Sequence, residues 1–295
     1  PAGQTKWEDA TIPFHFVDFS DTPGAVSRNS ASFIDPVIVQ AEDGTIYLMA
    51  DAFPYGTGAG QSKAGTGMIE ADGKKYLALT EKGNDVSNMN NFKMGILEDG
   101  TVWNFETDTA TEYSVDKDFN LYKAGKALTV QQRDSNLQYN GKNVSMNIFY
   151  EDSELQVYRT SYLWMASTKD NGKTWSAPQI LNELKGENEK FLGFGPGRGY
   201  VIQNGEHAGR ILIPVYSTAD GQGERSSVIY SDNNGKVWKR GPVTTLTNNA
   251  SVNPGKTSEA QFVELPDVTV RMYARGVTGY LGYADSVDGI TYGEF

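Results

Sequence analysis

The sequence lacks cysteine and contains only two histidines, His15 and His207, among its 295 residues. Disulfide frameworks and thiolate metal sites are therefore excluded, and a metal centre built from histidines is not expected. Basic residues are scarce too, since 26 Lys and Arg stand against 37 Asp and Glu, a formal net charge of -11. Because phosphate binding needs clustered Lys and Arg, we expect no nucleic acid partner and no binding to an anionic membrane surface. No motif indicates a metal ion or an organic cofactor.

Long apolar runs are also missing. No uncharged stretch reaches the roughly 18 residues that a transmembrane helix requires, so no membrane span is predicted. No basic and then apolar leader opens the chain, which we expect to be a soluble, mature or trimmed span. Aromatic residues and glycine are plentiful instead, with 16 Tyr, 13 Phe, 5 Trp and 32 Gly. This composition favours short strands joined by tight turns, and hence an all-β fold.

One eight-residue motif recurs along the chain. Residues Thr168–Trp175 read TKDNGKTW, Ser231–Trp238 read SDNNGKVW, and a degraded copy spans Asp285–Tyr292. The residues Gly3–Trp7 resemble the tail of a fourth copy. Asp or Asn can bond the backbone that follows it, and Gly supplies a positive φ, so each copy is expected to be a structural turn with no chemistry of its own.

The spacing of these turns indicates how much chain each unit contains. Trp175, Trp238 and Tyr292 follow one another at intervals of roughly 55 to 65 residues, which suits the four antiparallel strands of a β-propeller blade. The interval from Trp7 to Trp175 exceeds one blade by roughly 110 residues, so an insert is predicted there. We expect propeller strands in residues 1–55, a small β-rich insert in residues 56–160, and propeller strands again in residues 161–295.

Three predicted hairpins carry polar residues at corresponding ends. In a propeller the first strand of each blade lines the central channel, so the start of the first strand and the end of the second lie on one rim. We therefore expect six side chains to converge on one mouth, with the repeated turns on the opposite face and the insert beside the mouth. The predicted cross-strand pairs are Glu259 with Arg275 about a turn at Asp267, Asp35 with Asp51 about Asp43, and Arg198 with Tyr216 about His207.

Two of these pairs have ordinary alternatives. Glu259 and Arg275 also fit a cross-strand ion pair worth about 0.2 to 1 kcal/mol. Asp35 and Asp51 could both cap turns, although like charges directly opposite are destabilising unless they are hydrogen-bonded or used. They could also be the carboxylate pair of a glycosidase, which would retain configuration at a separation of about 5 Å.

The repeated turn resembles the Asp-box of sialidases, and further segments extend the likeness. Tyr162–Met165, Phe191–Gly197 and Asn204–Tyr216 are similar to segments of bacterial exo-α-sialidases of glycoside hydrolase family 33. The inserted block is typical of the large clostridial and pneumococcal type. The resemblance implies a six-bladed β-propeller with Asp-box repeats, of which this chain would contain about three to four blades, together with the β-rich insert.

The resemblance also implies roles for particular residues. In that family three arginines hold the sialic acid carboxylate, a Glu activates a Tyr nucleophile, and an Asp is the acid/base. The first and third arginines, the acid/base Asp and the nucleophilic Tyr are expected outside these 295 residues. The implied catalytic residues are Glu259, as activator of the tyrosine, and Arg275, as second arginine of the three. The implied substrate-binding residues are Asp35, Phe53 near the N-acetyl group, Tyr216, Arg275 and Arg225. Arg225 would lie on the glycerol side of the sugar, where relatives carry Gln.

The implied activity is hydrolysis of terminal α-linked sialic acid from glycoconjugates with retention of configuration. Sialylated glycans are the expected partners, and secretion or attachment to a bacterial cell surface is the expected location. Two alternatives remain open. One is a non-catalytic Asp-box propeller that binds a glycan or a protein at the same mouth. The other is an intramolecular trans-sialidase that releases an anhydro or unsaturated product.

Overall fold

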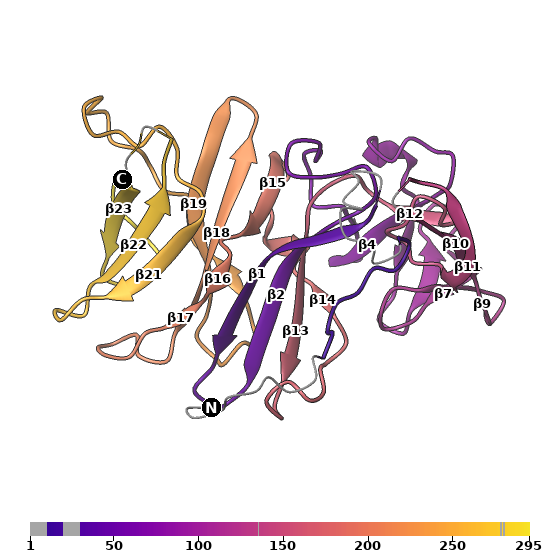
Figure 1. Ribbon diagram of the computed structural model, residues 1–295, viewed down its shortest axis with the longest axis horizontal. Helices are drawn as coiled ribbons and strands as arrows, with labels where there is room; N and C mark the ends of the chain where they lie inside the picture. Colours follow the sequence, from indigo (N-terminus) through magenta and orange to yellow (C-terminus); the bar gives the residue numbers. More distant parts are fainter. Residues whose placement is uncertain (1–10, 20–29, 135, 278, 280) are drawn as a thin grey trace.

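The computed structural model describes residues 11–19, 30–134, 136–277, 279 and 281–295. Three β-sheets stand side by side as consecutive blades, and a further set of strands lies beside the first blade (Figure 1). The predicted all-β propeller is confirmed, with three blades in the described part of the chain. The fourth copy of the repeat, expected at Gly3–Trp7, lies outside the described residues.

The first blade is interrupted by the inserted block. Its sheet has the strand order β14-β13-β2-β1-β16, and the chain leaves it after β2 to return at β13. β16, which belongs to the next blade along the chain, pairs with β1 in parallel and so joins the two blades near the centre. The strands are β1 (Ser32–Gln40), β2 (Ile46–Phe53), β13 (Tyr162–Thr168), β14 (Gln179–Ile180) and β16 (Gly197–Arg198).

The second and third blades follow without interruption. The second has the order β15-β18-β19-β20, with β17 also paired to β18, and the third has the order β21-β22-β23. The second-blade strands are β15 (Glu189–Phe194), β17 (Tyr200–Val201), β18 (Ile211–Ala219), β19 (Gln222–Ser231) and β20 (Lys239–Arg240); the third-blade strands are β21 (Ala260–Glu264), β22 (Val270–Arg275) and β23 (Leu281–Ser286).

The inserted block forms an eight-stranded sheet and a two-stranded hairpin. The boundaries 56 and 160 stay a prediction. The sheet contains β3 (Met68–Ala71), β4 (Lys74–Glu81), β5 (Met94–Ile96), β6 (Thr101–Asn104), β7 (Thr109–Val115), β8 (Leu121–Lys123), β9 (Lys126–Ala127) and β12 (Leu155–Val157); the hairpin contains β10 (Thr129–Arg133) and β11 (Tyr139–Ser145). The helical residues of the described chain are two single 3-10 turns, η1 (Met89–Asn91) and η2 (Asn182–Leu184), and none could span a membrane.

Apolar side chains pack between neighbouring sheets. In β22, Val270, Met272 and Ala274 are buried and alternate with more exposed residues, as expected for a strand packed on one face. In β13, Tyr162–Met165 are all buried because this strand packs against the insert on one side and the second blade on the other. Each blade is therefore held by its neighbours, which fixes the relative positions of the strand ends.

The repeated motifs form the predicted turns. In the first copy Asp170 Oδ1 accepts hydrogen bonds from Thr168 Oγ1 at 2.7 Å and from the Thr174 N–H at 2.9 Å. Asn171, at φ 60°, and Gly172, at φ 84°, occupy the left-handed region. Thr168 pairs with Ile46 at the start of β2, the end opposite to Asp51, so this turn lies away from the predicted mouth.

Candidate active site

Glu259 and Arg275 face each other as predicted. Ala260 pairs with Ala274 in the β21–β22 hairpin, and the Arg275 N–H donates to the Glu259 carbonyl at 3.0 Å. The Arg275 guanidinium donates through Nη1 to Glu259 Oε1 at 2.9 Å. The Arg275 side chain is 60% exposed and that of Glu259 is 38% exposed. The ion pair therefore presents both charges at the rim of the third blade.

The segment before Glu259 is fixed by bonds to the second blade. The Ser258 carbonyl accepts a hydrogen bond from Ser226 Oγ at 2.7 Å, and the Ser258 N–H donates to the Arg275 carbonyl at 3.1 Å. Thr257 Oγ1 accepts from the Ser226 N–H at 2.9 Å. These buried contacts set the height of Glu259 relative to β18 and β19.

Asp35 lies in a β-bulge, and its predicted pairing with Asp51 is wrong by one residue. Ile34 is the residue opposite Asp51, and Val37 is opposite Met49, so Asp35 and the following proline share one partner position. Asp35 has φ 53°, a left-handed conformation that Asp tolerates better than most residues. Burial raises the pKa of the Asp35 carboxyl, and the charge of Glu259 raises it further. The charge of Asp35 also raises the pKa of Asp51, so the carboxyl groups of Asp35 and Asp51 are close despite the altered register.

Tyr216 lies between the first and third blades in a row of aromatic rings. Its ring contacts Phe191 at a centroid distance of 5.1 Å, and Phe191 stacks on Phe53 at 6.3 Å. Burial raises the pKa of the Tyr216 phenol above its ordinary value, and the charges of Asp35 and Asp51 add to this effect. Phe53 is only 1% exposed, so it supports the aromatic row from below.

Arg225 is directed away from this group. Ser226 pairs with Tyr216, and adjacent residues of a strand point to opposite faces, so Arg225 lies on the other face of β19. Its Nη1 donates to the Glu224 carbonyl at 2.8 Å. The Glu224 carboxylate forms an ion pair with Lys256 at 2.5 Å. Of the predicted substrate-binding residues, Asp35, Tyr216 and Arg275 lie at the mouth, Phe53 is buried beneath it, and Arg225 lies on the other face of β19.

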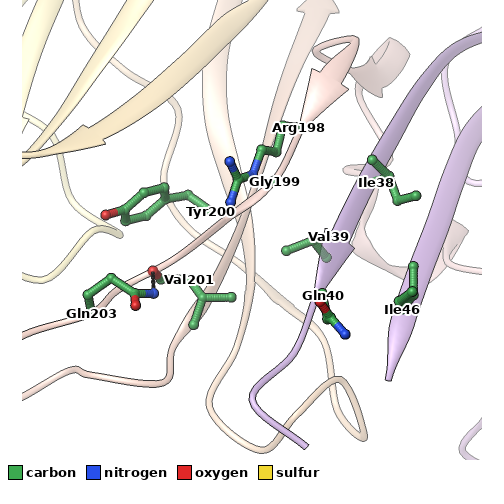
Figure 2. A pocket seen from close by; sticks show the side chains of 9 residues that line it. All are labelled: Ile38, Val39, Gln40, Ile46, Arg198, Gly199, Tyr200, Val201 and Gln203. Atoms are coloured by element: carbon green, nitrogen blue, oxygen red, sulfur yellow. Dashed lines mark hydrogen bonds between the residues drawn. The ribbon is translucent and has the colours of Figure 1, made fainter. Parts of the chain in front are cut away.

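Arg198 does not face Tyr216, which corrects the third predicted pair. Gly193 occupies that position opposite Tyr216, because the inner strand of the second blade breaks into β15, β16 and β17. Arg198 instead pairs with Ile38 on β1. Figure 2 shows its side chain beside a cavity of about 610 Å³ between β1 and β17, whose other wall includes Ile38, Val39 and Gln40. Five of the six expected side chains therefore share the mouth.

Asp51, one of the six residues expected at the mouth, is part of its floor, and the family resemblance implied no role for it. It is 0% exposed, and its Oδ1 accepts a hydrogen bond from the Phe194 N–H at 3.0 Å. Burial raises the pKa of Asp51 well above its ordinary range, the bond from Phe194 opposes this, and the charge of Asp35 adds to it. The glycine at position 193 is the sequence feature that reflects this packing, because a Cβ there would lie 2.3 Å from Asp51 Oδ2.

The site can bind an anion at its rim and activate a hydroxyl group beside it. The guanidinium of Arg275 suits a carboxylate ligand, and Glu259 is placed to accept a proton. A carboxylate pair of Asp35 and Asp51 does not fit an ordinary glycosidase, because Asp51 has no exposed surface through which to reach a substrate. Among the described residues no cluster of His, Asp and Glu side chains could hold a metal ion.

Comparison with known proteins relates this arrangement to sialidases. Residues 137–295 match the BNR repeat-like domain family. The chain is 35% identical over 97% of its length to the anhydrosialidase of Macrobdella decora and 33% identical over 83% to sialidase B of Streptococcus pneumoniae, covering 38% and 34% of those proteins. The solved intramolecular trans-sialidase of Ruminococcus gnavus superposes with a TM-score of 0.85 at 37% identity, covering 99% of this chain and 61% of that one.

The matched segments include the Asp-box turns, the strands that position Glu259 and Arg275, and the inserted block. The chain spans little more than a third of the length of the two curated relatives. Its three described blades correspond to part of a sialidase propeller. The chain belongs to the BNR repeat-like domain family and is homologous to the family 33 sialidases.

Proposed function

We propose that the protein containing this chain is an exo-α-sialidase that acts on terminal α-linked sialic acids of glycoproteins, glycolipids and oligosaccharides. The observation that carries this proposal is the ion pair of Glu259 and Arg275 at the rim, next to Asp35 and Tyr216. Arg275 would bind the sugar carboxylate as one of three arginines. Secretion or display on a bacterial cell surface fits an enzyme whose substrates are glycans outside the cell.

In this mechanism Glu259 draws the proton from a tyrosine contributed by another part of the propeller. The phenolic oxygen attacks the anomeric carbon as its proton passes to Glu259, so that no carboxylate nucleophile has to approach a carbon that already carries a carboxylate. The bond from that carbon to the aglycone oxygen breaks, and the acid/base Asp expected outside these 295 residues protonates the leaving oxygen. Attack on one face followed by displacement from the other gives retention. Tyr216 itself is unsuited to this role, because burial and neighbouring carboxylates raise the pKa of its phenol.

The experiment measures turnover of a sialyl fluorophore by the full-length protein and its Glu259→Gln variant. We expect kcat to fall by about a hundredfold or more, because the amide cannot accept the proton. Glu206→Gln is the matched control, since Glu206 is exposed in the turn at the opposite end of the second blade. Equal turnover by Glu259→Gln and the wild type would contradict the proposal.

The second candidate is an intramolecular trans-sialidase. Two of the proteins compared above carry the names anhydrosialidase and intramolecular trans-sialidase, and their identities of 35% and 37% exceed the 33% of sialidase B. Mass spectrometry of the released sugar separates the candidates, because an anhydro product lacks the mass of one water. Free sialic acid as the initial product, formed first as the α-anomer, supports hydrolysis with retention. Binding without any release would favour the non-catalytic alternative.

A further inference from the structure

Asp51 occupies the junction between the first two blades, directly beneath the mouth. It is a residue of β2, and its Oδ1 accepts the Phe194 N–H at 3.0 Å across the junction. The neighbouring Gly193 leaves room for the other oxygen, since a Cβ at that position would lie 2.3 Å from Oδ2. The carboxyl group is therefore fitted against the backbone of Gly193 and Phe194, with no path to solvent.

The second oxygen of Asp51 has no hydrogen-bond partner among the described residues. Oδ2 is buried, yet no N–H, hydroxyl or cationic group donates to it. A buried carboxylate is maintained by several donors or by a cation, and one backbone N–H supplies neither. A carboxylic acid with its proton on Oδ2 removes the charge, and the rise in the pKa of Asp51 caused by burial agrees with this form.

The groups around Asp51 determine what an ionised Asp51 would do to the site. Asp35, on β1, raises the pKa of Asp51, and Asp51 in turn raises the pKa of Tyr216, whose backbone pairs with Gly193. Glu224 on β19 and Glu259 beside the third blade also act on Tyr216, and Glu259 is paired with Arg275. An ionised Asp51 would add a negative charge below Tyr216 and beside Asp35. That charge would oppose the binding of a sugar that carries a carboxylate.

We propose that Asp51 is a positioning residue, a buried neutral carboxylic acid that holds Gly193 and Phe194 against the first blade and thereby sets the spacing of Asp35 and Tyr216. The inference rests on the proposed function, because it concerns the same sugar site. Asp51 does not touch the substrate. It acts through Asp35, on the adjoining bulge, and through Tyr216, which pairs with Gly193.

Two substitutions in the full-length protein separate the parts of this proposal. Asp51→Asn keeps an oxygen for the Phe194 N–H and cannot ionise, so we expect kcat and KM within about twofold of the wild type near about pH 6. Asp51→Ala leaves the Phe194 N–H unpaired and opens space at the junction, so we expect KM to rise about tenfold with a smaller change in kcat. Asp43→Asn, in the exposed turn of the same hairpin, is the matched control.

The pH profile supplies a readout that a purely structural role would not change. If ionisation of Asp51 weakens sugar binding, KM of the wild type rises at alkaline pH and that of Asp51→Asn rises less. Turnover by Asp51→Asn as poor as that by Asp51→Ala near about pH 6 would overturn the proposal, because it would show that the ionisable acid is required. Unchanged KM in Asp51→Ala would overturn it as well.

Infrared spectroscopy tests the protonation state without activity. The difference spectrum between wild type and Asp51→Asn near about pH 7 should contain the C=O band of a protonated carboxyl group, and a carboxylate band there would overturn the proposal. If Asp51→Ala does not fold, Asp51→Asn and this spectrum decide the question. Lack of sialoside turnover by the wild type would contradict the proposed function alone, whereas the spectrum bears only on Asp51.

Discussion

The most exposed charge at the mouth belongs to Arg275, and its geometry decides how it can bind a ligand. One nitrogen of its guanidinium bonds to Glu259, and 60% of the side chain is exposed. A guanidinium is a planar fork that can meet both oxygens of a carboxylate while another nitrogen keeps its internal partner. A lysine would supply the same charge through a single point.

Replacing Arg275 with Lys therefore tests whether the planar guanidinium binds both oxygens of the sugar carboxylate. We expect KM for a sialyl fluorophore to rise by about tenfold or more in the full-length protein, because the paired bonds to the sugar carboxylate are lost. Arg225→Lys is the comparison, because Arg225 lies on the far face of β19 and bonds to the Glu224 backbone carbonyl. A larger loss in Arg225→Lys than in Arg275→Lys would show that the sugar carboxylate binds elsewhere.

At the scale of strands, the accuracy of a predicted hairpin depended on whether its ladder is regular. The β21–β22 hairpin continues without interruption from Ala260 to Glu264, so counting outward from Asp267 placed Glu259 opposite Arg275 correctly. The β1–β2 ladder contains a bulge at Asp35, and the shift of one residue replaced Asp35 by Ile34 opposite Asp51. A bulge depends on local φ and on packing against the next blade, neither of which a count of residues contains.

The inner strand of the second blade shows a further limit. Its segments change partners near Gly195, where a Cβ would lie 3.0 Å from the Ala260 backbone nitrogen of the third blade. This close approach between blades breaks the strand and moves Arg198 to a position beside Ile38. The glycines of that segment permit close backbone packing, but the partner strand could not be named from the sequence.

The turns, in contrast, could be predicted because their bonds are local. Asp170 accepts from Thr168 and Thr174, and these bonds, led by the Thr174 hydroxyl, hold the pKa of its carboxyl well below the ordinary value. A depressed pKa contributes stability that is present above the unfolded-state pKa and is lost as pH falls towards the folded one. The contribution is therefore complete at neutral pH.

Asp170→Asn should lower Tm at about pH 7 and have a smaller effect at about pH 3, where protonation of the unfolded chain has already removed part of this contribution from the wild type. Thermal unfolding followed by circular dichroism at the two pH values measures the difference. Asp108→Asn serves as control, because Asp108 is exposed and lies in the turn between β6 and β7 of the insert. A decrease in Tm that is independent of pH would attribute the effect to packing of the turn.

At the scale of the whole molecule, the insert and the propeller share a core. Leu79 and Phe149 of the inserted block pack in one cluster with Ala52 and Trp164 of the first blade. The sequence predicted a β-rich insert beside the mouth from an excess of chain length. Its strand order and this shared core could not be predicted, because both depend on contacts between segments far apart in the chain.

A buried lysine lies at this junction. Lys185 is 4% exposed and donates to Thr160 Oγ1 and to the Lys190 carbonyl at 3.0 Å. Burial lowers the pKa of its amine to about 7, against the opposing charges of Glu189 and Glu187. Between about pH 7 and the unfolded-state value of about 10.4, the unfolded chain binds more protons than the native one, so this group makes stability rise with pH.

Lys185→Met should remove that dependence. We expect Tm of the wild type to rise relative to the variant between about pH 7 and about pH 9.5, because the free-energy cost of deprotonating the amine on folding falls as pH approaches the unfolded-state pKa. Lys63→Met changes an exposed lysine on the adjoining loop of the insert and should leave the slope unaltered. Parallel profiles for wild type and Lys185→Met would show that the pKa of the buried amine stays close to its unfolded-state value, so that the junction between insert and propeller would be insensitive to pH in this range.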